Sequence, residues 1–105
     1  MGSPAGAVLA FYDAVENHDW HTAIDLWSRS MQERYPPREW LIDRFRHTTR
    51  IDVTRIETVN RSGGRARVEI SLTEYRDVEP SPRRFVGAWD LVLRDGSWLL
   101  DNPDF

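Results

Sequence analysis

Histidine and carboxylate side chains gather between residues 18 and 25 of this 105-residue chain. His18 and His21 lie three residues apart, with Asp19 and Asp25 beside them. Imidazole and carboxylate groups bind metals, but a metal site needs three or four ligands that converge on one point. Two histidines at a turn fall short of that number. We therefore expect loop and capping roles for these residues, and we predict no metal site and no cofactor.

A second histidine–carboxylate combination lies near residue 45. Asp43 precedes His47 by about one helical turn, which is the spacing of an acid–base pair on one helix face. A protonated His47 near a helix end would alternatively interact favourably with the helix dipole. The sequence leaves both interpretations open.

Aromatic residues offer a third kind of chemistry, the enclosure of an apolar ligand. The five tryptophans are Trp20, Trp27, Trp40, Trp89 and Trp98. The first three recur on apolar faces of predicted helices, which favours core packing. The last two flank a turn, so we expect them to pair across a hairpin. An exposed tryptophan on the outer sheet face would instead indicate a dimer interface.

All 14 basic side chains are arginines, so chemistry that needs a lysine amine is excluded. Arg44, Arg46 and Arg50 form one small basic patch, and Arg83 with Arg84 forms another. Acidic residues are interspersed, which indicates a solvated surface of mixed charge. The alternative is a site for an anionic ligand or an acidic partner.

The overall composition excludes several classes of protein. The formal net charge is −3, which argues against a nucleic-acid surface. The absence of cysteine excludes disulfides, thiolate metal sites and cysteine nucleophiles. No apolar run approaches the roughly 20 residues of a membrane helix, and no signal peptide can be recognised, so we expect no membrane contact by this chain itself. The length fits a single domain, residues 1–105.

Helical periodicity dominates the first half of the chain. Ser3 is a suitable N-cap and Pro4 a suitable first residue for a helix whose apolar stripe is Val8, Phe11, Tyr12 and Val15. Asp19 is a suitable N-cap for a second helix. The sequence Ser30 to Glu33 fits a capping box and predicts a further short turn. Pro37 opens a third helix, which is expected to fade near His47.

Strand patterning begins after Arg50. An apolar residue out of phase predicts a bulge near Thr54 and Arg55. A glycine turn at 61–64 precedes a strand with Ala66, Val68, Ile70 and Leu72 on one face. Residues 85–93 are apolar at nearly every position, as in a strand covered on both faces. Asp95-Gly96 then predicts a tight hairpin.

This order predicts an α+β domain: three N-terminal helices packed in a strongly bent antiparallel sheet of about four strands, a cystatin-like cone with a concave mouth.

The order resembles the nuclear-transport-factor-two-like superfamily, a cone-shaped fold shared with ketosteroid isomerases and polyketide cyclases. The resemblance covers nearly the whole chain. It depends on Val8-x-x-Phe11-Tyr12-x-Ala14 with Asp19, Ala23, Leu26 and Trp27 at the front, and on Phe85-x-Gly87-x-Trp89-x-Leu91-x-Leu93 with Asp95-Gly96-x-Trp98 at the back. It implies a pocket between helices and sheet, and a homodimer formed through the outer sheet face. It is closest to compact bacterial members that serve as accessory domains.

In the isomerases, a tyrosine at the place of Tyr12 donates to a developing oxyanion together with a protonated carboxyl group. Asp90, in the middle of an apolar strand, is the candidate for that second group. By alternation, however, Asp90 lies on the face opposite Phe85 and Trp89, and packing explains Tyr12 equally well. The acidic residue that isomerases carry after the second helix has no counterpart in residues 28–37.

We therefore predict a non-enzymatic accessory domain that binds a small apolar or anionic ligand, or a protein. Whether the chain is an enzyme stays open: the alternatives are a small isomerase, cyclase or dehydratase that uses Tyr12 and Asp90, and an assembly domain with a filled pocket. The candidate pocket residues are Tyr12, Trp27, Trp40, Phe85 and Trp89. The compartment is left open between the bacterial cytoplasm and an exported domain of a longer or anchored protein.

Overall fold

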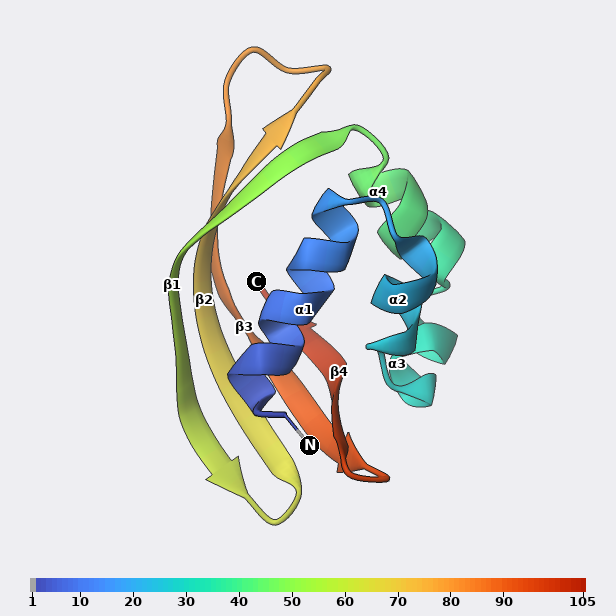
Figure 1. Ribbon diagram of the computed structural model, residues 1–105, viewed down its shortest axis with the longest axis vertical. Coiled ribbons are helices and arrows are strands. Elements are labelled where there is room, and N and C mark those ends of the chain that lie inside the picture. The colour runs from blue at the N-terminus through green and yellow to red at the C-terminus, as the bar shows by residue number, and fades with distance from the viewer. Residues whose placement is uncertain (1) are drawn as a thin grey trace.

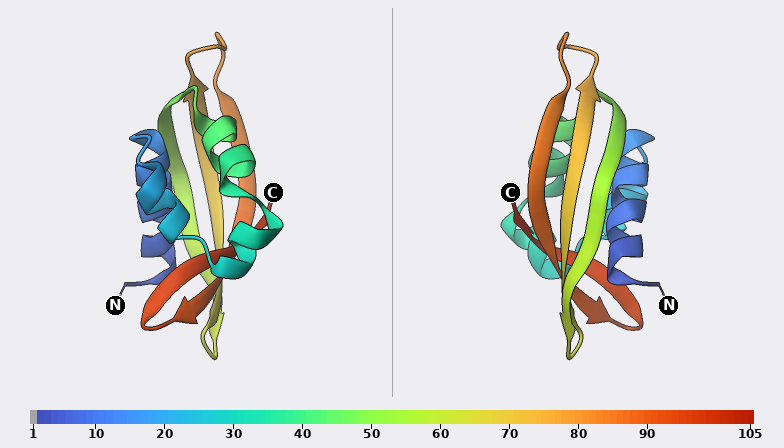
Figure 2. Two further views of the ribbon diagram at one scale, coloured as in Figure 1. Left: turned by 90° about the vertical axis from the view of Figure 1, so that its right-hand side faces the viewer. Right: turned by 90° about the vertical axis from the view of Figure 1, so that its left-hand side faces the viewer.

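The computed structural model describes residues 2–105 and places the helices before the strands. The helical part comprises α1 (Pro4–Glu16), α2 (Trp20–Asp25), α3 (Arg29–Arg34), the π-helical segment η1 (Arg38–Ile42) and α4 (Asp43–Phe45). The strands are β1 (Thr48–Ser62), β2 (Arg65–Arg76), β3 (Arg83–Arg94) and β4 (Ser97–Asp104). The helices gather on one side of the sheet, as Figures 1 and 2 show. The predicted α+β class is confirmed.

The four strands form an antiparallel sheet in the order β1-β2-β3-β4. The predicted bulge lies between Val53 and Arg55, where the register between β1 and β2 shifts. The sheet is neither closed nor strongly curled, so the strongly bent sheet expected from the sequence is wrong in degree. Three long strands run side by side and β4 crosses them obliquely on the helix side (Figure 2).

Side-chain caps set the helix starts. The Ser3 hydroxyl accepts from the Gly6 N–H at 2.9 Å, and Asp19 accepts from the Thr22 N–H at 3.3 Å, both as predicted. Ser28, not Ser30, caps α3 by accepting from the Met31 N–H. The predicted capping box at Ser30 is therefore wrong, because the helix begins two residues earlier and its N3 residue is Met31. The Ser28 backbone N–H donates to the Leu100 carbonyl of β4.

The core forms between α1 and the inner face of the sheet. The predicted alternation in β2 is confirmed, since Ala66, Val68, Ile70 and Leu72 are all buried. β3 is not covered on both faces, because Val86 on its outer face is 73% exposed. That strand is apolar along much of its length although part of its outer face meets solvent.

The two predicted turns are present, and positive φ angles occur in both. Gly63 and Gly64 have φ of 57° and 77°, and Asp95 and Gly96 have 52° and 81°. The predicted pairing of the last two tryptophans across the second hairpin is wrong. Trp98 faces Leu93, and Trp89 lies opposite Pro103, because β4 continues well beyond its first three residues.

Among residues 2–105, no helix combines the length and the apolar character needed to cross a bilayer.

Candidate ligand cavity

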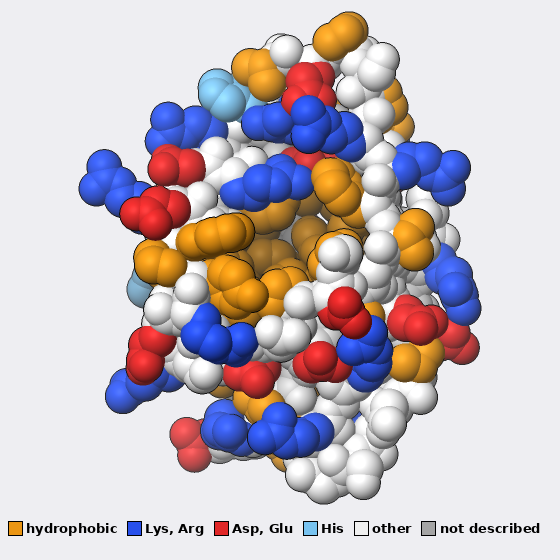
Figure 3. Space-filling model, turned by 180° about the vertical axis from the view of Figure 1, so that it is seen from behind, with side chains coloured by type: hydrophobic (Ala, Val, Ile, Leu, Met, Phe, Trp, Pro, Cys, Tyr) orange, Lys and Arg blue, Asp and Glu red, His pale blue; other side chains and the backbone are white. Residues whose placement is uncertain are grey.

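A cavity of about 330 Å³ lies between the helices and the inner face of the sheet. Its wall includes all five predicted pocket residues: Tyr12, Trp27, Trp40, Phe85 and Trp89. Figure 3 shows a hollow lined by hydrophobic side chains, with basic side chains at its edge. The volume is at the lower end of the range of roughly 300–1,000 Å³ that is typical of small-molecule sites.

Phe11 organises the aromatic wall. Its ring centroid lies 5.0 Å from that of Tyr12, 6.0 Å from Trp27 and 5.6 Å from Trp89. These are distances at which aromatic rings attract one another in edge and stacked arrangements. Trp40 differs from this group because its side chain is 56% exposed, and it lies at the rim against Tyr35.

Tyr12 and Trp89 form a polar contact inside this wall. The indole N–H of Trp89 donates to the Tyr12 hydroxyl at 3.0 Å, and both residues are buried. Burial raises the pKa of the Tyr12 phenol above its usual value, because the ionised form loses its hydration. The hydroxyl therefore stays protonated at neutral pH.

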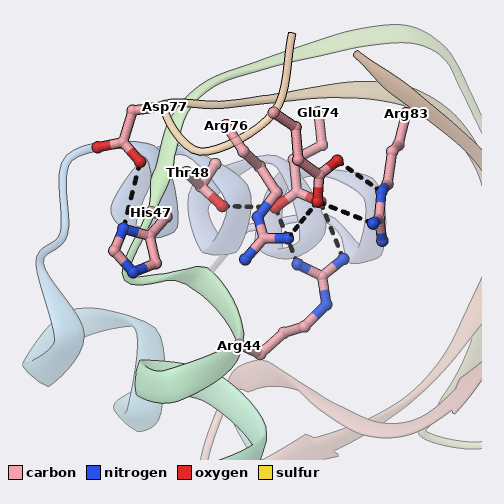
Figure 4. A network of polar contacts seen from close by, with 8 residues as sticks. Arg44, His47, Thr48, Glu74, Arg76, Asp77 and Arg83 are labelled. Atoms are coloured by element: carbon pink, nitrogen blue, oxygen red, sulfur yellow. Dashed lines mark hydrogen bonds and ion pairs between the residues drawn. The ribbon is translucent and has the colours of Figure 1, made fainter. Parts of the chain in front are cut away.

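Glu74 places a carboxylate in the cavity wall. Its side chain is 1% exposed, and Arg44 donates to both of its oxygens at 2.9 Å. The hydroxyl of Thr48 also donates to it. Figure 4 shows Arg44 reaching from the helical side toward Glu74, with its terminal nitrogens directed at the carboxylate. The charge is thus fully paired, as a buried carboxylate requires.

Sequence reasoning missed Glu74. The alternation that puts Ala66 to Leu72 on the buried face of β2 reaches Glu74 at its next step. Extending this alternation by one step would have predicted that Glu74 is buried, and Arg44 in the predicted basic patch was available as its partner. Arg44 itself packs against two aromatic rings of the wall, with its guanidinium carbon 4.5 Å from the Phe45 centroid and 5.5 Å from that of Phe85.

A second charged group continues beyond Glu74 toward the end of the sheet. Glu79 receives a hydrogen bond of 2.7 Å from Arg76 and one of 2.8 Å from Arg83 (Figure 4). Arg83 lies opposite Glu74 in the register of β2 and β3. The charges of the predicted second basic patch are therefore partly neutralised.

Asp90 does not join Tyr12. It lies on the opposite face of β3 from Phe85 and Trp89, as the alternation indicated, and pairs with Arg67 at 3.1 Å. Arg67 also binds Asp104. Asp90 is absent from the wall of the cavity, so the structure does not assemble the predicted Tyr12–Asp90 pair.

The histidines have individual contacts. His18 Nε2 lies 2.7 Å from the carbonyl oxygen of Thr48, and exposed His21 lies 3.4 Å from Asp25. The helical pairing considered for His47 is wrong: it contacts Asp77 at 3.2 Å.

Arg46 takes the place beside Asp43 that was considered for His47, at 2.7 Å. In the part of the chain that the structure describes, no three His, Asp or Glu side chains converge as metal ligands.

Comparison with known proteins finds a solved structure with a similar fold but does not identify a family. No protein-family model matches the chain, and no curated protein matches its sequence. The solution structure of RPA3114, a SEC-C motif containing protein from Rhodopseudomonas palustris, is similar with a TM-score of 0.65. The two share 13% identity over 89% of this chain and 70% of that one. At this identity the likeness shows the fold alone.

Proposed function

We propose that this chain is a binding domain that holds a small, largely apolar ligand in the cavity between its helices and its sheet. The observation that carries the proposal is the aromatic wall around a space of about 330 Å³. Such a wall removes apolar surface from water without requiring polar partners from the ligand.

The state of the polar groups favours binding over catalysis. A general base must be free to accept a proton from a substrate. Glu74 is instead held by Arg44 and Thr48, which donate to its oxygens. With Asp90 on the other face of β3, nothing supports the isomerase alternative by way of a Tyr12–Asp90 pair.

The wider resemblance remains part of the proposal. The motif around Phe11 and Tyr12, followed by an antiparallel meander, supports a place near the nuclear-transport-factor-two-like superfamily. The open sheet is a departure from its cone. A homodimer through the sheet face stays a prediction, and sedimentation at micromolar concentration would check it.

Titration with n-butylbenzene, followed by NMR of the indole N–H signals, tests the proposed function. We expect the signals of Trp27 and Trp89 to shift in a saturable manner, because both line the cavity. Trp20 is an internal control, since it lies outside the cavity and stacks on His18. Equal, unsaturated shifts of all three signals would contradict the proposal.

A cavity-filling variant provides the matched test. Leu72 is buried in the wall, so Leu72→Phe should fill part of the space and weaken butylbenzene binding by about tenfold. The control is Leu9→Phe, the same change at an exposed position of α1 outside the cavity, which should leave binding unchanged. Equal effects of the two variants would contradict a site in the cavity.

A further inference from the structure

Arg44 lines the cavity, and its guanidinium has an unused edge. Its two terminal nitrogens donate to Glu74, and these two hydrogen bonds occupy one edge of the planar guanidinium. The Nε–H and the second hydrogen of the neighbouring terminal nitrogen form another edge, which also has two donors. No side chain or carbonyl in residues 2–105 accepts from these groups, and the Arg44 side chain is 37% exposed.

Arg44 is held in one place. Two hydrogen bonds to a buried carboxylate fix its terminal nitrogens, and contacts with Phe45 and Phe85 fix its plane. A donor that is already oriented loses little conformational entropy when it binds a further acceptor. The unused edge is therefore a preorganised site beside an apolar space.

The geometry of that edge matches a planar group with two oxygens. Parallel N–H donors on a guanidinium bind a carboxylate through two hydrogen bonds, and the charge makes these stronger than bonds to a neutral acceptor. From this geometry we infer that the ligand of the cavity is an amphipathic carboxylate. Its apolar body lies against the aromatic wall and its carboxylate binds the free edge of Arg44. This inference rests on the proposed function.

The neighbouring charges permit an additional negative group. Arg44 and Glu74 pair one to one, whereas Arg76 and Arg83 share Glu79 in the neighbouring group. One positive charge of that neighbouring group is therefore unmatched. The exposed Asp77 pairs with His47, and solvent weakens its effect on the site.

Three ligands with the same carbon skeleton test the inference: n-butylbenzene, 4-phenylbutanamide and 4-phenylbutyrate. By calorimetry or NMR titration at low salt, we expect the carboxylate to bind about tenfold more tightly than the amide. If none of the three binds, the proposed function fails. If butylbenzene binds but the carboxylate is no better than the amide, the inference is overturned and the proposed function stands.

Two variants assign the preference to Arg44. Arg44→Lys keeps a charge for Glu74 but removes the fork, so the ratio of carboxylate affinity to amide affinity should fall toward one. Glu74→Gln removes the negative charge beside the site, so the advantage should grow. A purely structural role for the Arg44–Glu74 pair would instead weaken the carboxylate and the amide by the same factor in both variants, which would leave the ratio of their affinities unchanged.

The matched control is Arg84→Lys, the same change at an exposed position on the outer face of β3. It should leave the preference unchanged. A reduced preference in this control would show that general electrostatics govern it, and would overturn the assignment to Arg44.

Discussion

Arg44 and Glu74, 30 residues apart in the sequence, meet through two hydrogen bonds of 2.9 Å, yet they differ sharply in burial. Glu74 is 1% exposed and Arg44 is 37% exposed. Arg44→Met leaves a buried carboxylate with only Thr48 as a partner, whereas Glu74→Gln leaves a cation that is already partly in contact with water. We expect the first change to cost about 3 kcal/mol of unfolding free energy and the second about 1 kcal/mol, by urea denaturation.

The single variant Glu74→Leu and the double variant Arg44→Met, Glu74→Leu complete a double-mutant cycle with Arg44→Met. Replacing both members of a buried pair with apolar side chains is often nearly neutral, so the double variant should be more stable than Arg44→Met alone. A double variant as unstable as the sum of the two single changes would show that the pair is not coupled.

Tyr12 supplies the only acceptor that the described residues offer to the buried indole N–H of Trp89. Tyr12→Phe keeps the ring and removes that acceptor. We expect a loss of about 1–3 kcal/mol in unfolding free energy, since an unpaired buried donor retains its full desolvation cost. The indole N–H signal of Trp89 should also move in the NMR spectrum.

Tyr75→Phe is the control for this change. The Tyr75 hydroxyl has no hydrogen-bond partner within residues 2–105, and its side chain is only half-buried. Its removal should change stability by no more than about 0.5 kcal/mol. Similar losses in both variants would mean that the Tyr12–Trp89 contact contributes little.

The raised pKa of Tyr12 predicts a loss of stability in alkali. Its ordinary pKa is 10.0, and burial raises it in the folded state. The contribution of the Tyr12 proton to the free energy of unfolding is fully present below pH 10. It declines as the pH rises further, because the unfolded chain then releases this proton and the folded chain does not. The expected slope is about 1.4 kcal/mol per pH unit for the single group.

The chain has no lysine, so few other side chains titrate in this range. Urea unfolding between about pH 8 and pH 11 measures the slope. Tyr12→Phe should flatten this slope. An unchanged slope in Tyr12→Phe would assign the alkaline effect to other groups.

Local patterns predicted the elements well and the curvature poorly. Caps such as Ser3 and Asp19 act within three residues, so their geometry can be read from neighbouring positions. How far a sheet curls depends on contacts between distant segments. Here a bridge joins Trp27 to Leu100 and ties the end of α2 to β4, a contact that no local pattern encodes.

The sequence predicted the apolar residues of the cavity wall but not its buried charged residue, Glu74. Aromatic residues on predicted inner faces, such as Trp27 and Trp89, do line the cavity. Glu74 breaks the expectation that carboxylates face water, and only its partner Arg44, from a helix 30 residues earlier, makes its burial tolerable. Recognising such a pair requires knowledge of the tertiary contact.

Gly87 lies in close contact with the last two residues of the chain, Asp104 and Phe105. A Cβ at this position would lie 2.5 Å from the Phe105 ring and 2.6 Å from the carbonyl oxygen of Asp104. The Phe105 ring lies in the cavity wall, with its centroid 6.0 Å from that of Trp89, although it is 55% exposed. Gly87→Ala must therefore displace the end of β4, with a loss of about 1–3 kcal/mol.

The same displacement should remove Phe105 from the wall and weaken butylbenzene binding, which titration of the Trp89 indole signal measures. Gly2→Ala is the matched control, because a Cβ there meets no heavy atom of the described residues within 4 Å. Phe105→Ala should reproduce the binding defect of Gly87→Ala with a smaller loss of stability, since it leaves the β4 backbone in place. Normal binding in Phe105→Ala would show that this ring does not contribute to the ligand site.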